Sequence, residues 1–179
     1  MLKVNEIYLS IQGESTYTGL PCVFIRLTGC NLRCTYCDTE YAFYNGNERS
    51  VDEIIDKVRK YNCKLVEITG GEPLIQDESI ELIIKLCDND FTVMLETAGN
   101  MPIKNVDERV TIIMDLKCPS SAMMDKNLYD NVEHLKKDDE IKFVIGNRED
   151  YDWMKEIICK YDLQIKCKLL ASVVFGTLE

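Results

Sequence analysis

The chain has 179 residues, 46% hydrophobic and 29% charged, a composition typical of one folded domain and not of a disordered or low-complexity segment. Its 31 acidic and 21 basic residues give a net charge of -10, which disfavours binding to a nucleic-acid backbone or an anionic membrane surface. There is no export signal at the first residues and no apolar run near the roughly 18 residues of a membrane span. We therefore expect a cytoplasmic protein with no nucleic-acid and no membrane partner.

Short apolar, β-rich runs alternate with amphipathic helical runs along most of the chain, which is the pattern of repeated βα units around a parallel sheet. The predicted strands are, in chain order, 3–10, 22–28, 64–69, 91–96, 110–116, 140–145 and 166–171. The predicted helices are 50–61, 76–89 and 149–161, with a shorter one around 125–135. The first helix begins with Ser50 as N-cap and has Glu53 three residues later, a capping-box pattern.

The predicted fold class is α/β, an open, partial (β/α)6 barrel of TIM type with a mostly parallel sheet. A closed barrel of eight units needs about 250 residues, and this chain supplies about six strands of that pattern. Residues 1–179 show no internal boundary and are predicted to form a single domain. The last segment, KCKLLASVVFGTLE, contains a strand, a turn and the start of another element, so we expect a truncated C-terminal end.

Nine cysteines in a chain without an export signal indicate thiols and not disulfides. Six of them are scattered, several in apolar segments, and are predicted to be small buried hydrophobic residues: Cys22, Cys63, Cys87, Cys118, Cys159 and Cys167. The other three, Cys30, Cys34 and Cys37, lie within eight residues directly after an apolar strand. This second group is the candidate metal site.

The spacing CxxxCxxC places three thiolates where they can hold three corners of a 4Fe-4S cubane. The fourth iron then has no protein ligand, and such an open position lets a metal centre bind a substrate or cosubstrate directly. Zinc would need a fourth ligand from a scattered cysteine, because the only histidine, His134, is remote in sequence and is expected on the surface. A disulfide with one thiol left over is the other alternative.

With Tyr36 before the last cysteine, this loop resembles the radical S-adenosylmethionine (SAM) superfamily. The segment ITGGEP at 68–73 is similar to that family's glycine-rich motif, where the edge of a strand meets the amino group of SAM. Gly70 and Gly71 would permit the close backbone approach. The alternative is a tight turn that only starts the next helix. The resemblance implies that the cluster and SAM generate a 5'-deoxyadenosyl radical.

Three further segments resemble the 7-carboxy-7-deazaguanine synthases: EIYLSIQGES, CDT at 37–39 and DLKCPSS at 115–121. The resemblance implies a radical SAM lyase that converts 6-carboxy-5,6,7,8-tetrahydropterin to 7-carboxy-7-deazaguanine with loss of ammonia, on the route to 7-deazapurines such as queuosine. It also implies magnesium at Thr39, whose hydroxyl is a hard ligand of the kind magnesium accepts. Thr39 is alternatively a loop hydroxyl that caps a turn.

The substrate contacts implied by the resemblance are Ile11, Gln12, Gly13, Glu14, Arg26 and Thr69. Arg26 also makes physical sense, because a guanidinium pairs bidentately with a carboxylate and the substrate carries one. The alternative for Arg26 is an internal ion pair with Glu14 or Glu72. The alternative for Gln12 is a solvent-facing strand residue.

The SAM contacts implied in the same way are Tyr36, Cys37, Asp38, Gly71, Glu96, Lys117, Cys118 and Pro119. Glu96, at a strand end, would accept hydrogen bonds from the ribose hydroxyls; alternatively, Glu96 and Lys117 form a salt bridge between neighbouring strands. The chain departs from the family pattern at SVVFG, where Ser-Pro-Val-Phe-Gly is expected, and lacks a tail resembling LQLHK.

The alternative functions are an activase that installs a glycyl radical on a partner protein, and a non-catalytic iron-sulfur or zinc protein. The resemblance further implies a small-molecule pterin substrate, a flavodoxin-type or ferredoxin-type reductant, and a homodimer. Pairing of open sheet edges is a physical reason to expect the homodimer.

Overall fold

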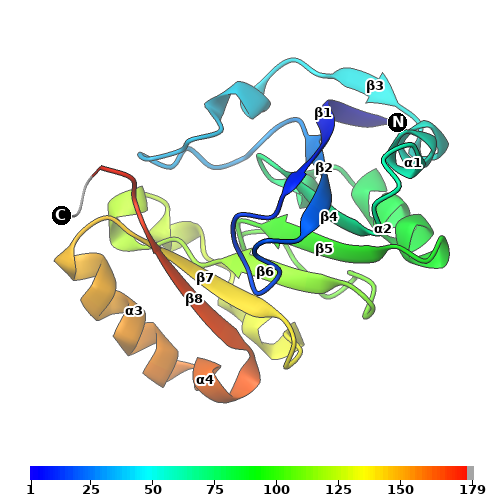
Figure 1. Ribbon diagram of the computed structural model, residues 1–179. Helices are drawn as coiled ribbons and strands as arrows, with labels where there is room; N and C mark the ends of the chain where they lie inside the picture. The colour runs from blue at the N-terminus through cyan, green and yellow to red at the C-terminus, as the bar shows by residue number, and fades with distance from the viewer. Residues whose placement is uncertain (177–179) are drawn as a thin grey trace. The chain divides into compact units, whose positions relative to one another are not determined.

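The computed structural model describes residues 1–176, which divide into two compact units (Figure 1). The first unit, the N-terminal unit, comprises residues 1–31, 39–96 and 105–111. The second, the C-terminal unit, comprises residues 32–38, 97–104 and the described residues from 112 onward. The prediction that 1–179 is a single domain stays a prediction.

The N-terminal unit is built on five strands in the order β3-β1-β2-β4-β5. Their bounds are β1 Leu2–Ile11, β2 Pro21–Leu27, β3 Asn47–Arg49, β4 Leu65–Gly70 and β5 Thr92–Thr97. β1 pairs antiparallel with β2 and β3, whereas β2, β4 and β5 are parallel to one another. One face of this sheet is apolar, with Ile25, Val66, Ile68 and Leu95 fully buried. Because side chains alternate along a strand, the polar residues between them lie on the opposite face.

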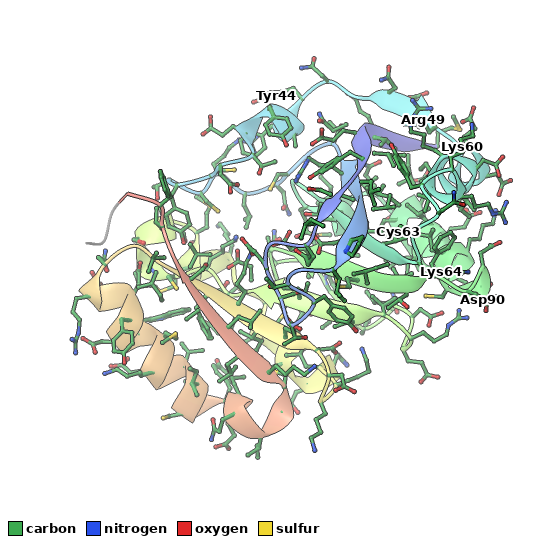
Figure 2. The ribbon with its side chains drawn as sticks, viewed as in Figure 1. Tyr44, Arg49, Lys60, Cys63, Lys64 and Asp90 are labelled. Atoms are coloured by element: carbon green, nitrogen blue, oxygen red, sulfur yellow. The ribbon has the colours of Figure 1, made fainter. Side chains whose placement is uncertain are left out.

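The helices of this unit are α1 Val51–Arg59 and α2 Glu78–Asp88, with 3-10 turns η1 Glu40–Phe43 and η2 Pro73–Ile75. Figure 1 shows α1 and α2 side by side. The predicted capping box of α1 is present: Ser50 accepts from the Glu53 backbone N–H at 3.2 Å, and the Glu53 carboxylate accepts from the Ser50 N–H at 2.7 Å. Arg49 before α1 and Lys60 after it are labelled in Figure 2.

The C-terminal unit is built on β6 Thr111–Asp115, β7 Glu140–Ile145 and β8 Lys168–Val173, which pair in that order and in parallel. Helix α3 Arg148–Lys160 packs along β7, and the short α4 Leu163–Lys166 precedes β8 (Figure 1). Three 3-10 turns lie between β6 and β7: η3 Pro119–Ser121, η4 Met124–Lys126 and η5 Tyr129–His134.

The predicted fold class is confirmed, since β2, β4 and β5 in one unit are parallel to one another, as are β6, β7 and β8 in the other, and α-helices or 3-10 turns connect successive parallel strands. All seven predicted strands are present, although β8 begins two residues later than predicted. The helix predicted around 125–135 is wrong, because this segment forms the 3-10 turns η4 and η5. The short elements β3 and α4 were not predicted.

The six scattered cysteines are only partly the buried residues predicted. Cys22, Cys118 and Cys167 are buried, Cys63 and Cys87 are half-buried, and Cys159 is exposed on α3. Cys159 lies on the outer face of an amphipathic helix, a position that the apolar sequence around it does not reveal. His134 is exposed, as predicted. No helix within residues 1–176 is both long and apolar enough to cross a membrane.

Candidate active site

A polar face of the sheet in the N-terminal unit carries two of the six predicted substrate contacts, Arg26 and Thr69. The register places Glu6 opposite Arg26 across β1 and β2, and Arg26 opposite Thr69 across β2 and β4. Alternation along each strand adds further polar side chains, so that the face consists of Glu6, Tyr8, Arg26, Glu67, Thr69 and Glu96. Arg26 is the single cation among these six residues.

The Arg26 guanidinium is held along one of its edges by β1. Its Nε donates to Glu6 Oε1 at 2.8 Å, and its Nη2 donates to the Tyr8 hydroxyl at 2.9 Å. Tyr41 donates from its hydroxyl to the same Glu6 oxygen at 2.9 Å, and its ring lies 5.8 Å from the guanidinium carbon. An internal ion pair is therefore present, but with Glu6 and not with Glu14 or Glu72.

This arrangement keeps Arg26 charged and pre-oriented. Burial alone would lower the pKa of Arg26, but the hydrogen bond to Glu6 and the neighbouring tyrosines raise it. With the Nε and Nη2 edge occupied, the edge formed by Nη1 and Nη2 retains the geometry for a second, bidentate carboxylate.

Gln12 is buried and faces the sheet, so the solvent-facing alternative is wrong. Its Nε2 donates to Glu67, and its Oε1 accepts from the Glu14 backbone N–H at 3.0 Å. The Gln12 side chain thus joins the loop after β1 to the middle of β4. Ile11, Gly13 and Glu14 around it are exposed.

Thr69 and Glu96 end neighbouring parallel strands and contact each other. The buried Thr69 hydroxyl donates to Glu96 Oε2 at 2.9 Å. Carboxyl ends of parallel strands are where α/β folds place binding groups, and this pair presents a carboxylate and a hydroxyl at that edge.

The turn after β4 packs directly against the backbone at Cys30. The Glu72 N–H donates to the Gly29 carbonyl at 2.8 Å, and the Gly71 N–H donates to the Leu27 carbonyl at 3.4 Å. A Cβ on Gly71 would lie 2.3 Å from the Gly29 oxygen and 2.6 Å from the Cys30 Cβ. The Gly-Gly pair is therefore required by a close approach to the first cysteine, and the buried Glu72 carboxylate caps η2 by accepting from the Leu74 N–H at 3.0 Å.

Within the C-terminal unit, the segment from Cys34 to Asp38 contacts the loop that follows β6. Thr35 bonds to Ser120 and Ser121, and the Tyr36 hydroxyl donates to the Val144 carbonyl at 3.4 Å. Burial, then Asp115, raises the pKa of Tyr36 well above its ordinary value, so the phenol stays protonated. Tyr36 is thus fixed between the cysteines by its side chain.

Lys117 pairs with Asp115 at 2.7 Å, the residue two positions before it. Burial would lower the pKa of Lys117, but Asp115 and the Cys34 thiol together raise it. Asp115 Oδ1 is buried and has no hydrogen-bond partner among residues 1–176. The backbone of Lys117 is fixed by Asn127, which bonds to both its N–H and its carbonyl.

The Cys118 thiol is fully buried, and burial raises its pKa to about 12. A contact from this residue to SAM would therefore involve its backbone and not its thiol. Pro119 follows as the first residue of η3.

The donor set of the cysteine loop suits an iron-sulfur cluster. Cys30, Cys34 and Cys37 form no disulfide and are partly exposed, in contrast to the buried Cys118. The backbone of Gly71, which has no Cβ, lies close to Cys30. Within residues 1–176, no group of three His, Cys, Asp or Glu side chains is gathered closely enough to hold a metal ion, so the ligation by all three cysteines stays a prediction.

Thr39 precedes η1 as its N-cap residue, but its side chain makes no capping hydrogen bond to that turn. The turn-capping alternative for this hydroxyl is therefore not supported.

The family model described as "Radical SAM superfamily" matches residues 24–161. A protein of Koribacter versatilis named 7-carboxy-7-deazaguanine synthase is 45% identical over 177 residues, covering 98% of this chain and 77% of the relative. The chain belongs to the 7-carboxy-7-deazaguanine synthase family of radical SAM proteins. A family member of the same name from Chlorobaculum tepidum is 42% identical over 99% of this chain and 82% of its own length.

Among solved structures, QueE from Escherichia coli matches with a TM-score of 0.81 and 22% identity, covering 98% of this chain and 85% of that chain. TYW1 with a lysine-pyruvate adduct matches with a TM-score of 0.64 and 14% identity, over 88% and 66% of the two chains. These two similarities show that this chain has the same fold as QueE and the matched part of TYW1. The radical SAM superfamily implies a 4Fe-4S cluster and SAM as cofactors.

The sequence prediction missed several polar residues that support the site. Glu6, Tyr8 and Tyr41 hold Arg26, Glu67 holds Gln12, and Asp115 holds Lys117. One signal was available: Glu67 interrupts the apolar run LVEIT, where an unpaired carboxylate would be costly. Tyr41 lies too far from Arg26 in sequence for any pattern to join them.

Proposed function

We propose that this chain is a 7-carboxy-7-deazaguanine synthase, which converts 6-carboxy-5,6,7,8-tetrahydropterin to 7-carboxy-7-deazaguanine with loss of ammonia. The observation that carries the proposal is the 45% identity to a protein of that name over 98% of the chain. Among residues 1–176, no described contact favours the glycyl-radical activase or a non-catalytic role.

Arg26 is the group we assign to the substrate carboxylate. Glu6 and Tyr8 occupy one edge of its guanidinium, and the other edge has the two-donor geometry that a carboxylate matches. Thr69 and the segment of Ile11, Gln12, Gly13 and Glu14 are the further proposed substrate contacts. Because both polar atoms of the Gln12 side chain already bond to the protein, Gln12 orders this segment and has one N–H and one lone pair left for the pterin.

The cluster and SAM, when bound, supply a radical that removes a hydrogen atom from the substrate and returns one after ring contraction. Cys30, Cys34 and Cys37 are the proposed cluster ligands. The proposed SAM contacts are Tyr36, Cys37, Asp38, Gly71, Glu96, Lys117, Cys118 and Pro119. Support comes from the close packing of Gly71 on Cys30 and from the influence of Cys34 on the Lys117 ammonium.

Magnesium at Thr39 is a further part of the proposal, and the hard oxygen of its hydroxyl, two residues after Cys37, supports it. We also propose a flavodoxin-type or ferredoxin-type reductant, a homodimer and a cytoplasmic location. Nine cysteines, none of which forms a disulfide among residues 1–176, support a reducing compartment.

The test is a product assay with anaerobically reconstituted, reduced protein, SAM, magnesium and the carboxytetrahydropterin. Formation of 7-carboxy-7-deazaguanine and ammonia, detected by mass spectrometry and a coupled ammonia assay, is the expected result. Absence of the deazaguanine from protein that binds about four irons per chain would refute the synthase. One zinc and no iron in anaerobically purified protein would refute radical chemistry altogether.

A further inference from the structure

Thr35, the first of the two residues between the second and third cysteines, is bound to the loop after β6. Its backbone N–H donates to the Ser121 carbonyl at 3.1 Å, and its hydroxyl donates to the Ser120 carbonyl at 2.6 Å. The Cys37 N–H donates to the Cys34 carbonyl at 3.2 Å and closes the turn around Thr35. The conformation of this turn therefore depends on where the Ser120 and Ser121 carbonyls are held.

Those carbonyls are held by Asp150, a fully buried carboxylate in the first turn of α3. Asp150 Oδ1 accepts from the Ser120 N–H at 2.9 Å. Its Oδ2 accepts from the Ser120 hydroxyl and from the Gly146 N–H, the latter at 2.7 Å. Three donors thus satisfy a group that would otherwise be costly to bury.

Two neighbouring features fix Asp150 itself. The Asn147 side chain caps α3 by accepting from the Asp150 N–H at 2.9 Å, and the positive end of this 13-residue helix favours a carboxylate there. A Cβ at Gly146 would lie 2.7 Å from the Ser120 hydroxyl and 3.2 Å from Asp150 Oδ2. The backbone of β7 therefore ends in close contact with the carboxylate, and its position is set by the sheet.

We propose that Asp150 is a positioning residue for the cysteine loop, acting through Ser120 on Thr35 and so on the geometry of Cys34 and Cys37. The effect on cluster binding rests on the proposed ligation by Cys34 and Cys37. The hydrogen bonds from Asp150 to Ser120 and from Thr35 to Ser120 and Ser121 are formed by the protein alone. Groups that orient metal ligands from behind commonly change metal retention by 10- to 100-fold when they are removed.

The first experiment compares Asp150→Asn with Asp152→Asn, a matched control on the same helix whose carboxylate is about half exposed and pairs only with Arg148 and Lys155. Hydrogen-deuterium exchange of the cluster-free chain is expected to show loss of protection at the Thr35 N–H in Asp150→Asn and not in Asp152→Asn. Unchanged protection in Asp150→Asn would overturn the proposal. This readout is independent of the cluster and of the proposed function.

The second experiment uses reconstituted holoprotein and follows iron loss to a chelator and the EPR spectrum of the reduced cluster. Asp150→Asn and Thr35→Val are expected to lose iron about 10- to 100-fold faster than the wild type. Thr35→Ser, which keeps the hydroxyl, is expected to restore slow loss. Equal rates for Thr35→Val and the wild type would overturn the proposal. The comparison of Thr35→Val with Thr35→Ser can be made even if Asp150→Asn fails to fold. If the reconstituted wild type contains no iron, the proposed cluster is refuted, but the hydrogen-deuterium exchange result at the Thr35 N–H remains valid.

Discussion

Gly71→Ala tests the close packing between the turn after β4 and the first cysteine. The new Cβ would lie 2.3 Å from the Gly29 oxygen and 2.6 Å from the Cys30 Cβ, and both neighbours belong to the main chain or are attached directly to it. An ordinary contact lies near 3.5 Å, so a displacement of about 1 Å is required. Such a displacement also strains the Glu72 N–H bond to the Gly29 carbonyl.

Overpacking of this kind costs about 1–3 kcal/mol, and a lost hydrogen bond adds about 1 kcal/mol. A loss of about 2–4 kcal/mol in the free energy of unfolding corresponds, for a chain of this size, to a fall in Tm of roughly 4–16 °C. Thermal unfolding of the cluster-free chain measures it, and iron per chain after reconstitution reports the displacement of Cys30. Gly13→Ala is the stability control, because nothing lies within 4 Å of its new Cβ. A Tm for Gly71→Ala equal to that of Gly13→Ala, with the full iron content, would refute the argument.

Three further changes test the polar face and one helix. Gln12→Ala removes a donor from the buried Glu67 and is expected to lower the free energy of unfolding by about 1.5–3 kcal/mol in urea titrations; an unchanged midpoint would contradict the buried bond. Arg26→Lys keeps the positive charge but removes the two parallel N–H donors of the guanidinium, so the KM for the pterin is expected to rise about tenfold with a smaller change in kcat. An unchanged KM would exclude carboxylate binding at this residue. Ser50→Ala removes the N-cap of α1 and is expected to cost about 1 kcal/mol of stability with no change in turnover, which thermal melts and the product assay check together.

The fold could be predicted from the sequence wherever the local pattern was strong. The apolar runs gave all seven predicted strands, and the Ser50 and Glu53 spacing gave the start of α1. The segment 125–135 was misassigned because its polar residues allow a helical period, whereas the structure holds it in 3-10 turns through tertiary bonds such as that from Leu128 N–H to the Gly99 carbonyl. Short elements such as β3 depend on pairing with β1, which no local pattern encodes.

Only those residues of the candidate site that belong to recognisable sequence motifs could be predicted. Arg26 and Thr69 were identified from their motifs, and the register places them opposite each other. The partners of these residues were not identified, since Glu6 reaches Arg26 by pairing of two strands 20 residues apart. The alternative considered for Arg26 was an ion pair with Glu14 or Glu72, but the pairing of β1 with β2 places Glu6 next to it.

The burial of three scattered cysteines has a consequence for the loading of iron. Burial raises the pKa of Cys22 and Cys118 to about 12 and that of Cys167 to about 11. At pH 8 the thiolate fraction of these three groups is on the order of one in a thousand or less, and only thiolates ligate iron. Burial and this low thiolate fraction disfavour their competition with the cysteine loop when iron and sulfide are supplied. The more accessible competitors are Cys63, Cys87 and the exposed Cys159.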